Sequence, residues 1–128
     1  SVKDGDKPAM VGPGRELLRL GFRLIATRGT AEYLNGEGVP CGVINKVMEG
    51  RPHIVDAMKN GEVQLVFNTT EGAQAIRDSF DLRRAALLNK IPYYTTVAGI
   101  CAATQGIEAL MSVGLEVKPL QSYFSGNF

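Results

Sequence analysis

Tryptophan is absent from this 128-residue chain, histidine occurs once and cysteine twice. Cys41 and Cys101 lack the spacing of metal ligands and lie in apolar segments, so we expect reduced, buried thiols of a cytoplasmic protein. The alternative is a single disulfide bond between them. A net charge of +1 gives no indication of non-specific binding to nucleic acid or to an anionic membrane. No apolar run approaches the ~18 residues that a membrane span requires.

Motifs for the common kinds of catalysis are missing as well. The chain contains neither the G-x-x-x-x-G-K-[ST] phosphate loop nor the G-x-S-x-G turn of serine hydrolases, and no cluster of metal ligands is visible. His53 follows Pro52 at an expected helix start, where a surface or capping role is commoner than general-base catalysis. The carboxylates of Glu49, Glu71 and Asp78 are scattered singly. The sequence therefore predicts a site that binds a ligand, with no catalytic residue, metal or cofactor.

What the chain does contain is a regular alternation of apolar runs and helical patterns. The strand-like runs are Ser1–Lys3, Phe22–Ala26, Cys41–Asn45, Val63–Asn68 and Ile91–Val97. The helical patterns are Pro8–Leu20, Thr30–Gly36, Pro52–Asn60, Ala75–Asn89 and Ala98–Ser112. Five strands alternating with helices predict an α/β fold, a five-stranded parallel sheet flanked by helices on both faces. Ligands of such sheets bind at the carboxyl ends of the strands.

Glycine and proline mark the expected boundaries of these elements. Pro52 suits the first turn of its helix, and Gly61 suits the residue just past the end of that helix. Gly12-Pro13-Gly14 is expected to kink or delay the first helix, because an interior proline costs about 3 kcal/mol. We expect a domain at 1–113 with a C-terminal tail at 114–128. The opening Ser1-Val2-Lys3 resembles the end of a strand, so we expect a domain excised from a longer protein.

The most informative local pattern is the turn Thr27-Arg28-Gly29-Thr30, which joins an apolar strand to a helix. Backbone N–H groups at a helix N-terminus lack intrahelical partners, and the helix dipole favours an anion there. Gly29 permits close approach of a ligand, and the hydroxyls of Thr27 and Thr30 can donate to phosphate oxygens. The alternative is that Thr30 is only an N-cap and Gly29 only a tight turn.

Other strand ends carry similar polar groups, which would meet in one crevice at the edge of a parallel sheet. They are Lys7, Thr27, Thr30, Asn45, Lys46, Asn68, Thr69, Thr70, Thr95 and Thr96, with Asp78 as a candidate acceptor for ribose hydroxyls. Taken singly, each has a plain alternative, since lysines at strand ends are usually solvated and threonine is common in strands. Their joint placement favours a phosphate-bearing ligand.

The segment Ile44–Gly72, INKVMEGRPHIVDAMKNGEVQLVFNTTEG, closely resembles the C-terminal regulatory domain of the carbamoyl-phosphate synthase large subunit. SVKDGDK at the start, ATRGTA, LRRAAL and YYTTVAG extend this resemblance over roughly 1–111. It implies a Rossmann-like, methylglyoxal-synthase-like five-stranded parallel sheet. It also implies a parent enzyme that makes carbamoyl phosphate for pyrimidine and arginine biosynthesis, using ATP and Mg or Mn in two synthetase halves and a small glutaminase subunit.

The same resemblance implies particular ligands. In bacterial members of the family this domain binds the nucleotide monophosphates UMP, an inhibitor, and IMP, an activator, and ornithine, an activator, at the border with a synthetase half. The implied nucleotide-binding residues are Lys7, Thr27, Gly29, Thr30, Lys46, Asn68, Thr69 and Thr70, while Thr95 falls at the ornithine site. Ala73 stands where some relatives carry a basic residue, and the Gly-Pro-Gly interruption is expected to alter the loop that presents Lys7.

Three alternatives stay open at this point. Methylglyoxal synthase, an enzyme acting on dihydroxyacetone phosphate, has this fold but requires carboxylates near the positions that Arg51 and Thr70 occupy here. The inosine-monophosphate cyclohydrolase domain of a bifunctional purine enzyme shares the Thr27–Thr30 turn. A domain without ligands could instead serve as an assembly surface, using the tail with Tyr123, Phe124 and Phe128.

Overall fold

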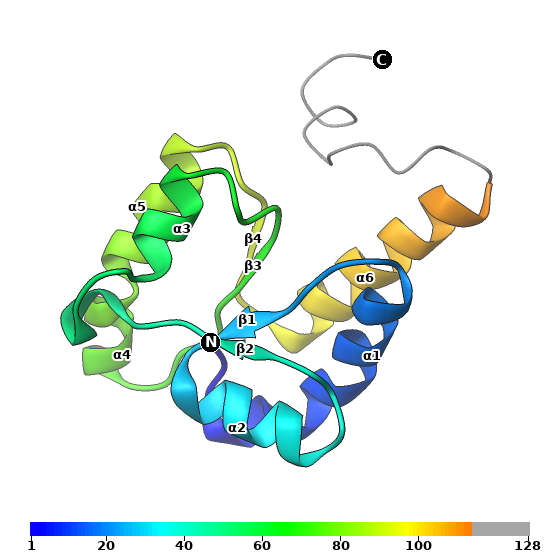
Figure 1. The fold of residues 1–128 in the computed structure, drawn as a ribbon, viewed down its shortest axis with the longest axis horizontal. Coiled ribbons are helices and arrows are strands. Elements are labelled where there is room, and N and C mark those ends of the chain that lie inside the picture. Colours follow the sequence, from blue (N-terminus) through cyan, green and yellow to red (C-terminus); the bar gives the residue numbers. More distant parts are fainter. Residues whose placement is uncertain (114–128) are drawn as a thin grey trace.

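The computed structural model describes residues 1–113, except for the side chain of Asp78. The expected tail at 114–128 lies outside the described residues. The fold is of the α/β type that the alternation predicts (Figure 1). None of the helices in the described part of the chain combines the length and apolar character needed to cross a membrane.

The strands form two small parallel sheets instead of the expected sheet of five strands. Strand β1 (Ile25–Ala26) pairs with β2 (Gly42–Val43), and β3 (Val66–Phe67) pairs with β4 (Tyr93–Tyr94). A single parallel bridge also joins Asn45 to His53. Each strand is shorter than predicted because ladder bonds to a paired neighbour extend over only two residues.

The predicted first strand, Ser1–Lys3, is not a strand in the structure. The amino group of Ser1 donates to the carbonyl of Phe67 at 3.0 Å, and its carbonyl accepts from the N–H of Thr69 at 3.1 Å. The next two N–H groups of this segment donate to side-chain hydroxyls rather than to a strand. The segment therefore touches β3 through one residue only, and the chain then enters the 3-10 turn η1 (Asp4–Asp6).

The remaining helical elements follow the predicted order with shifted boundaries. They are η2 (Pro8–Met10), α1 (Val11–Arg19), α2 (Arg28–Gly36), η3 (Val47–Glu49), α3 (Ile54–Lys59), α4 (Ala73–Asp78), α5 (Phe80–Leu88) and α6 (Val97–Ser112). Pro13 lies in the first turn of α1, where it removes no intrahelical hydrogen bond, so Gly12-Pro13-Gly14 begins the helix without kinking it. Gly14 packs closely, since a Cβ there would lie 3.2 Å from a Val39 methyl carbon, which would have to shift.

Two predicted helices need correction. The pattern at Ala75–Asn89 forms two helices divided at Ser79, whose hydroxyl donates back to the carbonyl of Ala75 at 2.8 Å. Pro52 lies outside α3, because His53 is the N-cap residue of that helix. The predicted role of Gly61 is confirmed, since it follows α3 with φ 75° and its N–H donates to the carbonyl of Met58.

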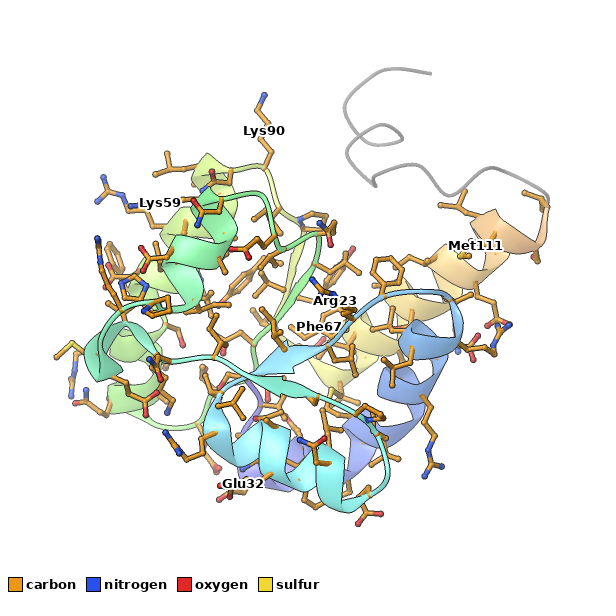
Figure 2. All side chains as sticks on the ribbon, viewed as in Figure 1. Arg23, Glu32, Lys59, Phe67, Lys90 and Met111 are labelled. Atoms are coloured by element: carbon orange, nitrogen blue, oxygen red, sulfur yellow. The ribbon has the colours of Figure 1, made fainter. Side chains whose placement is uncertain are left out.

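The apolar core has parts on both sides of the strands. Figure 1 shows α3, α4 and α5 on one side and α1, α2 and α6 on the other. Met58 and Ala86 anchor the first side, while Ile100 and Leu17 anchor the second. Phe67 lies in the interior between them, in edge-to-face contact with Tyr94 at 5.9 Å between ring centroids (Figure 2). The strands thus join two packed groups of helices.

Candidate phosphate-binding site

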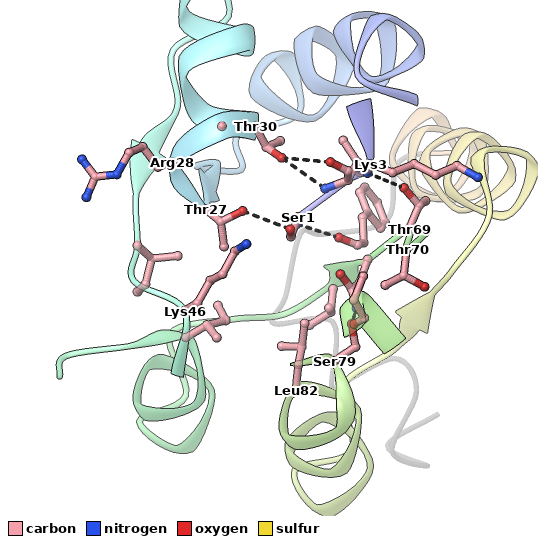
Figure 3. Close-up of a pocket in the computed structure, with 18 of the residues that line it drawn as sticks. Ser1, Lys3, Thr27, Arg28, Thr30, Lys46, Thr69, Thr70, Ser79 and Leu82 are labelled. Carbon is pink, nitrogen blue, oxygen red and sulfur yellow. Dashed lines mark hydrogen bonds between the residues drawn. The ribbon is translucent and has the colours of Figure 1, made fainter. Parts of the chain in front are cut away.

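A cavity of about 610 Å³ opens at the carboxyl ends of β1 and β3, beside the start of α2 (Figure 3). It is lined by Lys7, Thr27, Gly29, Thr30, Lys46, Asn68, Thr69 and Thr70, so the structure brings these predicted site residues together. Asp78 ends α4, and its side chain lies outside the described residues. Thr95 does not line this cavity and is exposed between β4 and α6.

The N-terminus of α2 has no side-chain cap. Thr27, and not Thr30, is the N-cap residue, and its hydroxyl donates to the Ser1 hydroxyl at 3.0 Å instead of capping the helix. Within residues 1–113 the N–H groups of Gly29 and Thr30 have no hydrogen-bond acceptor. By contrast, α3 and α6 are capped by the side chains of His53 and Thr96. The helix end that faces the cavity is therefore left with free donors for an anion.

Lys7 reaches the same helix end from η1 and η2. A Cβ on Gly29 would lie 3.3 Å from the Lys7 ammonium nitrogen, so the end of the lysine side chain lies directly against this glycine. The Lys7 ammonium pairs with the exposed carboxylate of Asp4, and the hydrogen bond from Lys7 lowers the pKa of that carboxyl. An anionic ligand on Lys7 would compete with Asp4.

Lys46 supplies a second ammonium from the loop after β2. Its backbone N–H donates to a Glu49 carboxylate oxygen at 2.7 Å, which fixes the start of η3. Its side chain extends toward Thr27 and Ser1 (Figure 3). No carboxylate of the described residues forms an ion pair with it. Lys46 is thus a cation in the cavity without a bound counter-charge.

Other predicted ligand-binding side chains hold the cavity wall together. Thr30 accepts from the N–H of Val2 at 3.1 Å, and Thr69 accepts from the N–H of Lys3 at 3.0 Å. The side-chain amide of Asn68 donates to the Ser79 hydroxyl at 2.9 Å and to the Tyr93 hydroxyl at 2.6 Å. The sequence predicts that these groups bind the ligand directly; in the structure Thr30 and Thr69 accept from backbone N–H groups, and Asn68 joins two side-chain hydroxyls.

Several lining residues were not predicted from the sequence. They include Ser1, Lys3, Arg28, Arg77 and Ser79. Arg28 is part of the Thr27–Thr30 turn, so its position in that turn could have indicated that it lines the cavity. Arg77 lies in a helical pattern of the sequence, and nothing in that pattern indicates a place in the cavity wall. Its guanidinium donates to the Gln74 side chain at 2.7 Å.

Among the described residues, the acidic side chains and cysteines do not form a metal centre. The described residues contain no group of histidine, cysteine and carboxylate side chains able to hold a metal ion. Cys41 and Cys101 are free, as expected, but they are half-buried rather than fully buried. Burial raises the pKa of the Cys41 thiol, which keeps it protonated.

Parallel strand pairs, helices on both sides and an uncapped helix N-terminus at the strand ends define an α/β domain with a cavity at the strand ends. Residues 9–95 match the model of the MGS-like domain, and the chain belongs to this family. The methylglyoxal-synthase-like resemblance of the sequence is thereby confirmed.

The chain is also similar to carbamoyl phosphate synthase large chains. It is 52% identical over 124 residues to the large chain of Brucella suis and 54% identical over 124 residues to that of Rhizobium meliloti. These matches cover 97% of this chain but 11% of each relative, so the chain spans about a tenth of their length. Over 129 residues it is 47% identical to the "Carbamoyl phosphate synthase large chain, C-terminal section" of Methanopyrus kandleri, covering 100% of this chain and 24% of that relative.

Proposed function

We propose that this chain is the allosteric regulatory domain of a glutamine-dependent carbamoyl-phosphate synthase large chain and binds nucleotide monophosphates. The names of its relatives support the assignment of this parent enzyme. One observation supports the location of the binding site: across the cavity, the uncapped N-terminus of α2 faces the ammonium of Lys46, which forms no ion pair within residues 1–113.

The phosphate of the nucleotide would bind at the start of α2. The free N–H groups of Gly29 and Thr30 donate to its oxygens, and Lys46 and Lys7 balance its charge. Thr27 adds a hydroxyl from the same turn. The rest of the cavity, lined by Asn68, Thr69 and Thr70, takes the ribose and base, with Asp78 as an acceptor for ribose hydroxyls. Charge-assisted hydrogen bonds of this kind contribute about 1.5–3 kcal/mol each.

Regulation requires that each ligand prefer a different state of the parent enzyme. In this proposal UMP inhibits and IMP activates from overlapping positions in the cavity. Ornithine binds elsewhere, because Thr95 lies outside the cavity, between β4 and α6. Residues of a synthetase half complete that second site.

The domain itself catalyses no reaction in this proposal. Synthesis of carbamoyl phosphate for pyrimidines and arginine takes place in the synthetase halves, with ATP and Mg or Mn, on ammonia from the small glutaminase subunit. The proposed location of the assembly is the cytoplasm.

Calorimetric titration of the chain with UMP and with IMP, in buffer free of phosphate and sulfate, tests the proposal. We expect saturable binding of at least one nucleotide and a loss of about 10- to 150-fold in affinity for Lys46→Ala. Lys59→Ala is the matched control, because Lys59 is exposed at the end of α3 and does not line the cavity. Equal affinities of the two variants would remove Lys46 from the site, and the absence of binding by the folded wild-type chain would contradict the proposal for this domain.

A further inference from the structure

The side chain of Asn68 lies between two hydroxyl groups that come from different elements. Asn68 directly follows β3, is 4% exposed and lines the cavity of the candidate site. Its amide nitrogen donates to the Ser79 hydroxyl at 2.9 Å and to the Tyr93 hydroxyl at 2.6 Å. Ser79 separates α4 from α5, and Tyr93 is the first residue of β4. Ser79 lines the cavity as well, whereas Tyr93 does not.

Ser79 determines which end of the Asn68 amide faces it. The hydroxyl oxygen of Ser79 lies 2.8 Å from the carbonyl oxygen of Ala75, and two oxygens at this distance need the hydroxyl proton between them. Because its one proton is used there, the Ser79 hydroxyl can only accept from Asn68. The part of Asn68 that meets Ser79 is therefore the NH₂ group and not the carbonyl oxygen. Tyr93 accepts the second N–H, so both amide hydrogens are bound.

The carbonyl oxygen is the part of the Asn68 amide that is left free. Within residues 1–113 no group donates to it, and no side-chain nitrogen or oxygen of these residues is both fully buried and without a partner. The oxygen is therefore accessible, and the space that Asn68 lines is the cavity. Ser79 and Leu82 lie on the wall opposite Thr30, away from the start of α2 (Figure 3). An acceptor on this wall meets the nucleoside part of a nucleotide whose phosphate binds at the start of α2.

Tyr93 is itself fixed in position, as a residue that orients another must be. Its backbone pairs with Val66 in the parallel ladder of β3 and β4, and its side chain packs against the apolar core on the α3 and α5 side. The guanidinium of Arg83, on α5, lies 5.7 Å from the centre of the Tyr93 ring, within the range of a cation–π interaction. The Tyr93 hydroxyl is thus a stationary acceptor for the Asn68 amide.

We infer that Tyr93 and Ser79 are positioning residues for nucleotide recognition, which hold the carbonyl oxygen of Asn68 toward the cavity as a hydrogen-bond acceptor. The ligand group that it binds is a donor of the nucleoside part, a ribose hydroxyl or a ring N–H of the base. This inference rests on the proposed nucleotide site and adds how that site recognises the nucleoside. Binding of the phosphate at the start of α2 does not depend on it.

Substitution of Tyr93 separates the two ends of the ligand. Tyr93→Phe keeps the ring and removes the hydroxyl that accepts from Asn68. In calorimetric titration, affinity for UMP or IMP, whichever binds the wild type more tightly, is expected to fall about 3- to 10-fold. Affinity for inorganic phosphate, measured by competition with that nucleotide, is expected to change by less than about twofold. Tyr94→Phe is the matched control and should leave both affinities unchanged, because the Tyr94 hydroxyl has no hydrogen-bond partner within residues 1–113.

Nucleotide analogues identify the donor that Asn68 binds. The 2′-deoxy and 3′-deoxy forms each lack one ribose hydroxyl, and the form with a methylated ring nitrogen lacks the N–H of the base. The analogue without the contacted donor is expected to bind the wild type more weakly and to lose no further affinity in Tyr93→Phe. A full Tyr93→Phe loss with all three analogues would show that Asn68 contacts none of these donors and would overturn the inference.

Hydrogen exchange of the Asn68 side-chain amide, followed by NMR without ligand, tests the positioning directly. Exchange in the wild type is expected to be slower than at the exposed Asn60 side chain, and Tyr93→Phe is expected to accelerate it at least about fivefold. Unchanged exchange in Tyr93→Phe would overturn the inference. So would an unchanged nucleotide affinity, or an equal loss for nucleotide and inorganic phosphate, which would indicate a general structural defect. Failure of the wild-type chain to bind any nucleotide would instead contradict the proposed function, and the recognition role with it.

Discussion

The hydroxyl of Thr30, in the first turn of α2, accepts a hydrogen bond at 3.1 Å from the backbone N–H of Val2. Thr30 is 5% exposed, and Val2 is also buried. A residue predicted to donate to phosphate thus fixes the N-terminal segment of the chain against the helix that bears the candidate site. The segment also carries Lys3, whose N–H is held by Thr69, so two hydroxyls hold it on opposite sides.

Thr30→Val is expected to lower the free energy of unfolding by about 1–3 kcal/mol, because the buried N–H of Val2 loses its acceptor. Thr30→Ser keeps the hydroxyl and is expected to cost less than Thr30→Val. Urea denaturation of both variants measures the difference. A valine variant as stable as the wild type would show that this hydrogen bond contributes little.

Asp4→Asn is expected to strengthen phosphate and nucleotide binding by about twofold to fivefold. The substitution removes the carboxylate that pairs with Lys7 and competes with an anionic ligand for it. Asp6→Asn is the matched control, since Asp6 lies in the same 3-10 turn but does not line the cavity. Calorimetric titration with the nucleotide that binds the wild type measures the effect. An equal gain for both variants would point to net charge and not to release of Lys7.

His53 contributes to stability in two ways, by capping α3 and by packing its buried ring, and two substitutions can separate these contributions. The Nδ1 atom of His53 accepts from the N–H of Asp56 at 3.3 Å, and the Asp56 carboxylate accepts from the N–H of His53 at 3.2 Å. Both His53→Ala and His53→Asn remove the buried ring, but asparagine retains an acceptor. We expect the alanine variant to be less stable than the asparagine variant by about 1 kcal/mol in urea denaturation. Equal stabilities would assign the role of His53 to packing alone.

Lys90 has a left-handed backbone conformation, with φ 56°, just past the end of α5. Its N–H and that of Ile91 close the helix on the carbonyls of Leu87 and Ala86. Lys90→Gly is expected to stabilise the fold by about 1 kcal/mol, because glycine adopts this conformation without steric cost. Lys59→Gly, inside the last turn of α3, should instead be destabilising. Thermal unfolding of both variants checks the opposite signs.

We expect the chain to release no phosphate from dihydroxyacetone phosphate. Removal of a proton beside a carbonyl requires a positioned base, and the two positions compared with catalytic aspartates hold Arg51 and Thr70. Arg51 is exposed, does not line the cavity and lies 3.8 Å from a carboxylate oxygen of Asp56. A coupled phosphate assay, with a genuine methylglyoxal synthase as positive control, measures this. Sustained turnover by the purified chain would reinstate the enzyme alternative.

Local chemistry was sufficient to predict much of the fold. Gly61 follows α3 as predicted, and a helix begins within the Thr27–Thr30 segment. Both features depend on neighbouring residues, a glycine after a helical pattern and a change from an apolar run to a helical pattern. The division of α4 from α5 was missed. It depends on Ser79, which accepts a hydrogen bond from the side chain of Asn68, a residue on a different element.

The sequence by itself determined the alternation of elements, the family and the set of polar residues at the strand ends. Tertiary structure alone decided what each of those residues is free to do. The hydroxyls of Thr30 and Thr69 hold backbone groups 28 and 66 residues away, while the ammonium of Lys46 forms no ion pair in the described part of the chain. A hydrogen-bond partner is chosen by proximity in the folded chain, and residues this far apart in sequence become neighbours only when the helices pack around the strands.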